Sequence, residues 1–429
     1  MSIRQFITSF LNRKGGQVLF SFFFSKLSRF LIAIVIINLL PKSEYGFIVY
    51  ALSILSFLMP LMGAGIPQGL ARYGSLSDSQ RQKKYLLQQA MKKGLLASAV
   101  LVVVLLCLVP ILTKNVPQSA FYLAVISFQL LAMLVYHFVS VYSRLLHLNH
   151  IFAQIENVHN VLLTISTIVM CYLFGGAGYV FSLVLVPLSV GLYYMYRLRL
   201  WEPVRGAIEG MKIDFKEYIS YGLSVSIGGL LSQMLYTVDI LLLGNILANS
   251  EELIAQYKAA TIFPFSLLFI PVAIIATDYV KLARAAIKDP QYLKQYYLNY
   301  LKLFTGVAIL IFLFFYFFGE YLLGLFGKDY QQVPELMVIF AAGVVGGLLF
   351  RVPLGNILSA IGLPKVNAMF SAIILLMNVA GSYLMIQRHG ILGAAYVTAA
   401  LMWLSGLFSL GAFYWFLKKK VAHKKRPCT

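Results

Sequence analysis

The chain alternates long apolar runs with short polar connections from one end to the other. Runs of about 20 apolar residues are long enough to cross a bilayer as α-helices. Windows of that length predict twelve membrane-spanning helices, with limits at 17–39, 46–66, 94–113, 119–141, 153–174, 178–197, 219–246, 254–277, 300–322, 335–357, 366–386 and 390–416. The pattern therefore predicts a multi-pass membrane protein built from helices.

Basic residues are unevenly shared between the two ends of these helices. Of the 35 Lys and Arg residues, 27 lie in the N-terminal segment, in the connections after even-numbered helices and in the tail. The opposite side holds four, and these are Lys42, Lys114, Lys328 and Arg388. Because cytoplasmic connections collect basic residues, both termini are predicted to lie in the cytoplasm.

The composition supports this interpretation and narrows the function. The 429 residues are 60% hydrophobic and 12% charged, with a mean hydropathy of +0.82, which leaves no room for a sizeable soluble domain. A net charge of +20 would suggest nucleic acid in a soluble chain, but cytoplasmic basic loops explain it here, so we expect no nucleic-acid partner. The three cysteines are widely spaced, and we expect neither a disulfide framework nor a metal site. The sequence shows no Gly-rich phosphate loop and no ATP-binding domain, so we expect no cofactor.

The chain divides near its middle into two halves of six predicted helices. We expect an N-terminal lobe at 1–200, a cytoplasmic linker at 201–218 and a C-terminal lobe at 219–429 that includes the basic tail. Tyr50 precedes Arg72 by 22 residues, and Tyr257 precedes Asp278 by 21. Six spans per half give both halves the same orientation, which predicts parallel repeats related by an axis along the membrane normal.

Four basic residues, Lys26, Arg29, Lys258 and Arg351, lie inside the apolar runs. A basic side chain at a helix centre costs at least about 2.5–3.5 kcal/mol, so such residues usually face a bundle interior or a wet cavity. Lys26 and Arg29 are three residues apart and share one helix face. We interpret the four as candidate binding residues for an anionic cargo. A structural ion pair is the alternative for the first two, and reaching the interface is the alternative for Lys258 and Arg351.

Two acidic residues in the apolar runs are the candidates for ion coupling or charge pairing. Asp239 could pair with Arg29, carry a coupling proton or cation, or neutralise a cavity. Glu156 lies towards the cytoplasmic end of its predicted helix, and so does His137, which we interpret as a packing residue. These alternatives stay open at the level of the sequence.

Several short segments in order resemble one known family over nearly the whole chain. The first half contains Leu39-Leu40-Pro41-Lys42-Ser43-Glu44-Tyr45-Gly46, then Gly63-Ala64-Gly65-Ile66-Pro67 and Ala71-Arg72-Tyr73. The second half contains Asp239-Ile240-Leu241-Leu242-Leu243-Gly244 and Leu325-Phe326-Gly327-Lys328-Asp329-Tyr330. With these segments the chain resembles the Wzx-type polysaccharide flippases of the MOP (multidrug, oligosaccharidyl-lipid, polysaccharide) exporter superfamily.

The resemblance implies an all-α integral membrane fold of the MATE/MOP type, with about twelve helices in two six-helix lobes around a central cavity. It implies a transporter rather than an enzyme, located in the bacterial cytoplasmic (inner) membrane. Its cargo would be an undecaprenyl-pyrophosphate-linked oligosaccharide, moved by alternating access to the outer leaflet for O-antigen, lipopolysaccharide or capsule assembly. Membrane lipids, a polysaccharide polymerase and a chain-length regulator would be its partners.

Two other functions remain as alternatives. A cation-coupled drug/cation antiporter on the same fold would favour an acidic, aromatic cavity, whereas the buried charge in this chain is mainly positive. A membrane polysaccharide polymerase or glycosyltransferase would need catalytic groups on a substantial outer loop, and the predicted outer loops are short. Lipid II flippases of the same superfamily usually have fourteen helices, so twelve argues against that branch.

Overall fold

The computed structural model describes residues 30–75, 79–146, 148–204, 215–234 and 237–424. Within these ranges all regular secondary structure is helical, which confirms the all-α prediction. The first half comprises a short helix at Phe30–Leu39 and then α3 (Lys42–Leu58), η1 (Met59–Gly65), α4 (Ile66–Ser75), α5 (Gln80–Leu112), α6 (Ser119–Ser127), α7 (Gln129–Leu145) and α8 (Asn149–Arg197).

The second half repeats this order of elements with several interruptions. It comprises α9 (Phe215–Met234), α10 (Val238–Ile246), α11 (Glu251–Ser266), α12 (Phe269–Lys288), α13 (Pro290–Gly324), η2 (Lys328–Tyr330), α14 (Glu335–Gly346), η3 (Gly347–Arg351), α15 (Val352–Ala360) and α16 (Pro364–Lys424).

The described helices account for the predicted spans. Eight helical stretches are long and apolar enough to cross a membrane, and Phe30–Leu39 and Tyr218–Leu231 are shorter apolar helices. Two of the eight, α8 and α16, each cover two predicted spans and bend between them, at Gly175 and Gly390. Outside residues 17–29 and 235–236, which the structure does not describe, each predicted span coincides largely with helix.

The bends in α8 and α16 have nearly the same backbone geometry. Gly175 has φ 60° and ψ −144°, and Gly390 has φ 57° and ψ −137°. Such angles are open essentially only to glycine. Three residues later, a Cβ on Gly178 or on Gly393 would overlap the carbonyl group of the residue eight positions earlier. Each half therefore ends in a tight helical hairpin that requires two glycines.

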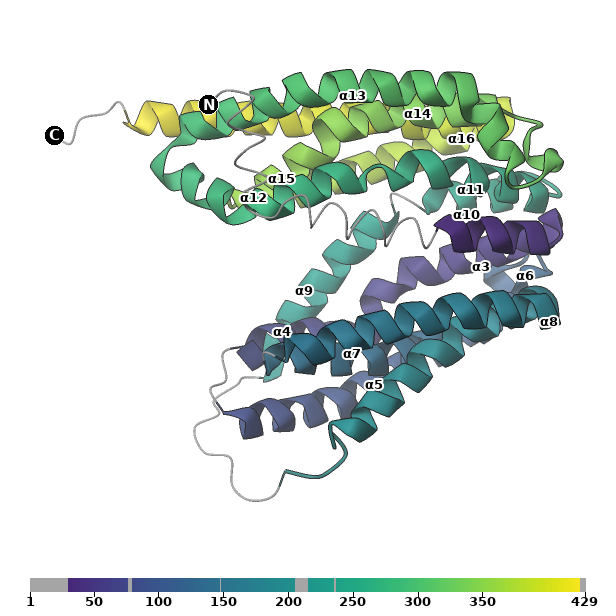
Figure 1. Cartoon of the computed structure of the whole chain (residues 1–429), viewed down its shortest axis with the longest axis vertical. Coiled ribbons are helices and arrows are strands. Elements are labelled where there is room, and N and C mark those ends of the chain that lie inside the picture. The colour runs from purple at the N-terminus through teal and green to yellow at the C-terminus, as the bar shows by residue number, and fades with distance from the viewer. Residues whose placement is uncertain (1–29, 76–78, 147, 205–214, 235–236, 425–429) are drawn as a thin grey trace. The chain divides into compact units, whose positions relative to one another are not determined.

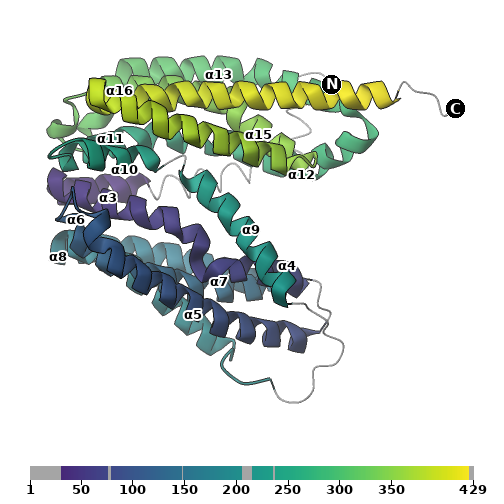
Figure 2. The same ribbon diagram turned by 180° about the vertical axis from the view of Figure 1, so that it is seen from behind.

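The structure groups the chain into two compact units. The C-terminal unit contains residues 1–34 and 255–429, and the N-terminal unit contains 35–254. In the N-terminal unit α9 packs against η1 and α4, while α13, α14 and α16 lie side by side in the C-terminal unit (Figures 1 and 2). These units differ from the predicted lobes at 1–200 and 219–429. That those lobes move as bodies stays a prediction.

Identical residues recur at a constant spacing in the two halves. Pairs that lie 207 residues apart include Asn38 and Asn245, Ser43 and Ser250, Glu44 and Glu251, and Tyr50 and Tyr257. The bend glycines Gly175 and Gly390 lie 215 residues apart, because the second half has eight more residues before its last hairpin. The recurrence of both residues and bends supports the predicted parallel repeats.

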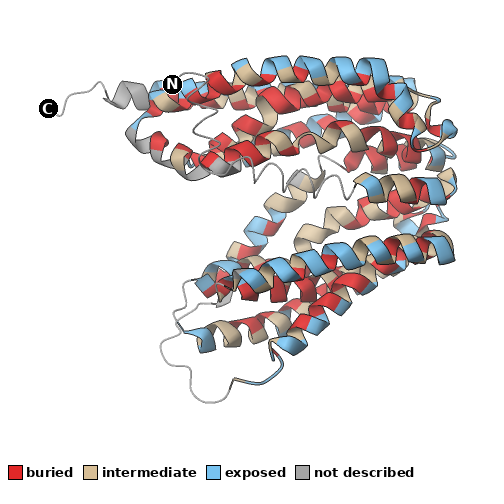
Figure 3. Cartoon of the chain, in the orientation of Figure 1, coloured by how far each residue is buried: buried red, intermediate tan, exposed pale blue. Residues whose placement is uncertain are grey.

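Exposure differs between the helices in the way that a membrane protein requires. Exposed positions follow one face of α13, and they include Phe317 and Tyr321, each with 70% of its surface exposed (Figure 3). Large apolar groups on an outer helix face suit lipid rather than water. The helix pair α14–α15 is more enclosed, because 61% of its most apolar window is buried.

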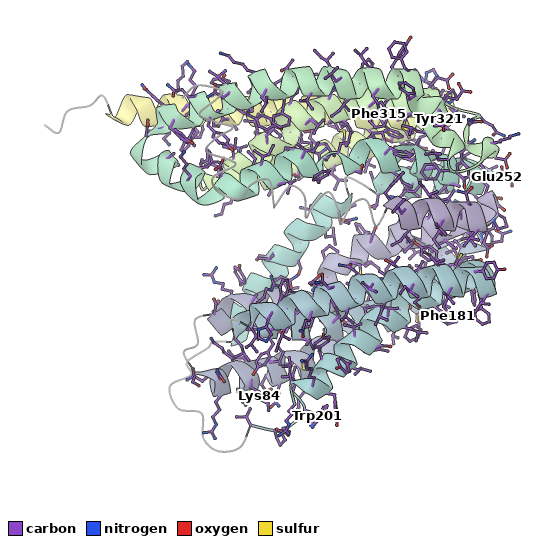
Figure 4. All side chains as sticks on the ribbon, viewed as in Figure 1. Lys84, Phe181, Trp201, Glu252, Phe315 and Tyr321 are labelled. Carbon is purple, nitrogen blue, oxygen red and sulfur yellow. The ribbon has the colours of Figure 1, made fainter. Side chains whose placement is uncertain are left out.

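The polar end of the N-terminal unit is organised around the first turns of α5. The side-chain amide of Gln88 donates to the carbonyl oxygens of Leu200 (2.9 Å) and Glu202 (2.7 Å). Lys84 Nζ lies 3.9 Å from Glu202 Oε2, and Trp201, which is about half exposed, lies at the same end (Figure 4). An exposed Trp beside Lys is typical of the membrane–water interface. These contacts lie on the side that the basic residues assign to the cytoplasm.

Candidate functional site

The two cations predicted on the first helix lie outside the described residues. Lys26 and Arg29 both precede Phe30, where the described part of the chain begins. Their role as the centre of an anion site stays a prediction. The structure does describe the other candidates, Arg351, Lys258, Asp239 and Glu156.

Arg351 ends a π-helical turn inside the tenth predicted span. This turn, η3, separates α14 from α15. The N–H of Val352 bonds to the carbonyl of Gly347, five residues earlier instead of the four of an α-helix. The carbonyl of Leu348, which would accept that bond in an α-helix, is therefore released.

A proline releases a second carbonyl in the same turn. Pro353 has no N–H, so Leu349, four residues earlier, loses its usual donor. Two tyrosines of α13 replace the missing donors. The hydroxyl of Tyr300 donates to the Leu348 oxygen at 2.8 Å, and that of Tyr297 donates to the Leu349 oxygen at 3.0 Å. Both released carbonyls are satisfied, as a membrane interior requires.

The side chain of Arg351 is half-buried and lies deeper than its place in the predicted span suggests. Helix α15 continues to Ala360, nine residues beyond Arg351. At 1.5 Å per residue the arginine lies about 14 Å from that end of the helix. Its role as a binding residue stays a prediction.

Lys258 is half-buried in the second turn of α11. The helix starts at Glu251, three residues before the predicted span, which places Lys258 about 10 Å along it. The neighbouring Tyr257 packs edge-on against Phe340, with ring centroids 5.1 Å apart. Lys258 and Arg351 both belong to the C-terminal unit.

Asp239 occupies the first turn of α10 and is only 4% exposed. Helix α10 begins at Val238, inside the predicted seventh span, and Thr237 before it has the non-helical angles φ −128° and ψ −19°. Helix N-termini stabilise negative charge through the helix dipole and their N–H groups. Asp239 therefore lies at a helix N-terminus inside a predicted span, and its role in ion coupling or charge pairing stays a prediction.

Glu156 lies among polar side chains of α7 and α8 in the N-terminal unit. The hydroxyl of Ser140 donates to its Oε1 at 3.4 Å. His137 is close enough to interact electrostatically with Glu156, Arg144 and His159. His137 thus lies near one carboxylate, one guanidinium and one other imidazole from α7 and α8.

The residues that sequence reasoning missed are Tyr297, Tyr300 and His159. A proline inside an apolar span signals a released carbonyl four residues earlier, but not the hydroxyl that meets it. His159 follows Glu156 by three residues, so both share one helix face, and this spacing was a usable signal. The imidazole of His159 packs against Tyr136, with ring centroids 4.6 Å apart.

The paired helical hairpins and the long apolar helices define an all-α, multi-pass membrane protein. A multidrug resistance MATE family transporter of the MOP superfamily, inward-facing, has the same fold, with a TM-score of 0.70 at 14% identity over 94% of this chain and 96% of that chain. The lipid II flippase MurJ, in an inward closed conformation, gives 0.70 at 12% identity, with 96% and 94% covered. A MOP superfamily transporter from Pyrococcus furiosus gives 0.63 at 15% identity over 96% and 94%.

The family is given by sequence. The model of the polysaccharide biosynthesis protein family matches residues 13–277, which is more than half of the chain. The chain therefore belongs to that family, on the MOP fold. A search of curated proteins finds no significant match.

Proposed function

We propose that the protein is a flippase for lipid-linked oligosaccharides. Its cargo would be a glycan on undecaprenyl pyrophosphate, moved from the cytoplasmic to the outer leaflet of the bacterial inner membrane for O-antigen or capsule assembly. The observation that carries the proposal is the family match, because it spans the segments that contain Lys26, Arg29, Glu156, Asp239 and Lys258. Arg351 lies beyond the matched range and adds a cation from the second half.

The physical problem that such a protein solves is the polar head of the lipid. Neither sugar hydroxyls nor a diphosphate can be satisfied in hydrocarbon, so a bare bilayer blocks the head. Basic side chains along a hydrated passage would balance the diphosphate while the lipid tail stays in the bilayer. An inside-negative potential helps an anion to move outward, by about 2.3 kcal/mol per charge per 100 mV.

The candidate residues then divide into two roles. Lys26, Arg29, Arg351 and Lys258 would bind the diphosphate, and Asp239 and Glu156 would carry a coupling ion or pair with the cations. Alternating access would come from movement of the two lobes against each other. Both termini would lie in the cytoplasm, and a polysaccharide polymerase with its chain-length regulator would use the product on the outer side.

A deletion strain complemented with variants tests the proposal. We expect Lys26→Ala/Arg29→Ala and Arg351→Gln to reduce surface polymer at least tenfold, with lipid-linked oligosaccharide retained on the inner leaflet. The matched controls are Lys114→Ala and Arg388→Ala, which remove exposed cations on the outer side and should leave surface polymer unchanged. Surface polymer and membrane-inserted protein are measured together in every strain.

Two outcomes would overturn the proposal. Full surface polymer in the Lys26→Ala/Arg29→Ala strain would remove those cations from the function. Normal polymer in the deletion strain itself, combined with increased sensitivity to cationic drugs, would favour the antiporter on the same fold.

A further inference from the structure

The π-turn that contains Arg351 is held from outside its own helix. Tyr297 and Tyr300 are three residues apart, share one face of α13 and are fully buried. Their rings stack on each other, with centroids 6.4 Å apart and planes 9° from parallel. Tyr300 also stacks on Phe304 at 4.5 Å. The two hydroxyls that meet the released carbonyls are thus fixed by their own packing.

A second helix closes the other side of the turn. A Cβ on Gly406 of α16 would lie 2.6 Å from the Cβ of Phe350 and 3.0 Å from the backbone nitrogen of Arg351. Only glycine lets α16 approach this closely. Phe413, also on α16, meets the ring of Tyr297 edge-on at 5.5 Å. The backbone of Arg351 is therefore confined between α13 and α16.

The extra residue of the turn sets the direction of the arginine. In an α-helix each residue adds about 100° of rotation. If the π-turn became a regular α-helical turn, the side chains after it would therefore rotate about the helix axis by about that angle. π-turns are rare and occur frequently at functional sites. Arg144, which lies 207 residues before Arg351, is in the last turn of α7 without any π-turn. Within the described parts of the chain, the π-turn occurs only in the second half.

We propose that Tyr297 and Tyr300 are positioning residues for Arg351. By holding the two carbonyls of the π-turn, they direct the guanidinium towards the hydrated passage, where it meets the anionic diphosphate of the cargo. The assignment rests on the proposed flippase function for the identity of that anion. The orientation of residue 351 itself is measurable without any cargo.

The experiment uses cysteine labelling in the full-length protein. Cys107, Cys171 and Cys428 are replaced, and Arg351→Cys is introduced as the single thiol. A small anionic thiosulfonate reagent then measures how fast position 351 reacts in membrane vesicles. We expect ready labelling, and a rate about tenfold lower when Tyr297→Phe and Tyr300→Phe are added.

The matched control changes two tyrosines on the exposed face of the same helix. Tyr316 is 59% exposed and Tyr321 is 70% exposed. Tyr316→Phe/Tyr321→Phe should therefore leave the labelling rate at position 351 unchanged. The rate is measured per folded molecule, so a purely structural loss would lower the protein yield but not the rate. An unchanged rate in the Tyr297→Phe/Tyr300→Phe protein overturns the proposal.

A second variant covers the case in which the double change does not accumulate. Pro353→Ala supplies the N–H that Leu349 lacks, so the helix can satisfy its own carbonyl when Tyr297→Phe is also present. This protein should fold, yet its π-turn can anneal to α, and labelling at position 351 should fall severalfold. Retained labelling in this variant would contradict the assignment.

Surface polymer separates this proposal from the flippase function. In the protein that keeps Arg351, Tyr297→Phe/Tyr300→Phe should reduce surface polymer as Arg351→Gln does. Slower labelling together with normal polymer would overturn the link between Arg351 and the cargo. Loss of polymer in Arg351→Gln with unchanged labelling in the tyrosine variants would leave the flippase function standing and remove the positioning role.

Discussion

The two glycine bends of α8 and α16 share a backbone shape but are held in different ways. At the first bend the carboxylate of Glu44 accepts a hydrogen bond from the N–H of Gly176 at 3.0 Å and another from the hydroxyl of Tyr122 at 2.7 Å. At the second bend the position of Gly176 is taken by Ile391, which is 6% exposed. The hairpin of the first repeat is stabilised by hydrogen bonds to a carboxylate, and that of the second repeat by a buried isoleucine.

This comparison distinguishes a feature that the fold requires in both halves from a feature that differs between the halves. The bend geometry recurs because a helical hairpin this tight tolerates only glycine at two positions. The contacts that stabilise the bend differ between the halves, because either hydrogen bonds to a carboxylate or burial of an apolar side chain is sufficient. The same holds for the tenth helix, where the π-turn has no counterpart at Arg144 in α7.

The largest expected effect comes from breaking the shared geometry. Gly178→Val and Gly393→Val each place a side chain against a backbone carbonyl that cannot move independently. Each should destabilise the protein by about 3 kcal/mol or more, at the high end for overpacking. The fraction of protein that remains monodisperse after heating, measured by size-exclusion chromatography in detergent, reports the loss.

The control for the bend variants is Gly306→Val on α13. A Cβ at Gly306 meets nothing within 4 Å, so the substitution should shift the melting temperature very little. If Gly178→Val or Gly393→Val melted like Gly306→Val, the two hairpins would not be equally tight. That result would contradict the shared geometry directly.

A smaller effect should distinguish the two hairpins. Glu44→Ala leaves the Gly176 N–H and the Tyr122 hydroxyl without their acceptor, and should cost about 2–3 kcal/mol. The control is Glu251→Ala at the equivalent position of the second half. Glu251 lies in the first turn of α11 and contributes mainly through the helix dipole, so its loss should cost less than about 1 kcal/mol.

Thermal stability of the two glutamate variants, compared in the same detergent, checks this difference. Equal losses would show that the second half depends on its glutamate as much as the first half does. A stabilising glutamate would then be a common feature of both repeats rather than a feature of the first hairpin alone.

How far the sequence allows prediction depends on the range of the interactions. The twelve spans and the two bends follow from hydropathy and from glycines close together, which are local signals. The start of α10 inside the predicted seventh span has no such signal, because Thr237 and Val238 are neither glycine nor proline. A continuous helix is the natural prediction there.

The candidate site is predictable to a lesser degree for the same reason. Charges inside apolar runs identify Arg351, Lys258, Asp239 and Glu156 from the sequence alone. The groups around them come from distant parts of the chain, as Tyr297 and Tyr300 meet a turn about fifty residues later. No local pattern states which hydroxyl reaches which carbonyl. Contacts of this kind emerge only from the packing of whole helices.

The smallest expected effect concerns a hydroxyl present in both halves. Ser98 and Thr305 lie 207 residues apart, and Ser98 is fully buried while Thr305 is exposed. The Ser98 Oγ accepts from the N–H of Gly63 at 2.9 Å in the break of the second helix, whereas Thr305 only donates to the Leu301 carbonyl of its own helix. Ser98→Ala should cost about 1–2 kcal/mol, because a buried N–H loses its partner.

Thr305→Ala should change stability by less than about 0.5 kcal/mol, because an exposed hydroxyl that bonds back to its own helix adds little. Melting curves of the two alanine variants, measured side by side, make the comparison. A Thr305→Ala loss as large as that of Ser98→Ala would mean that the ninth helix needs its hydroxyl as the third does. The hydrogen bond from Gly63 would then not explain the contribution of Ser98 to stability.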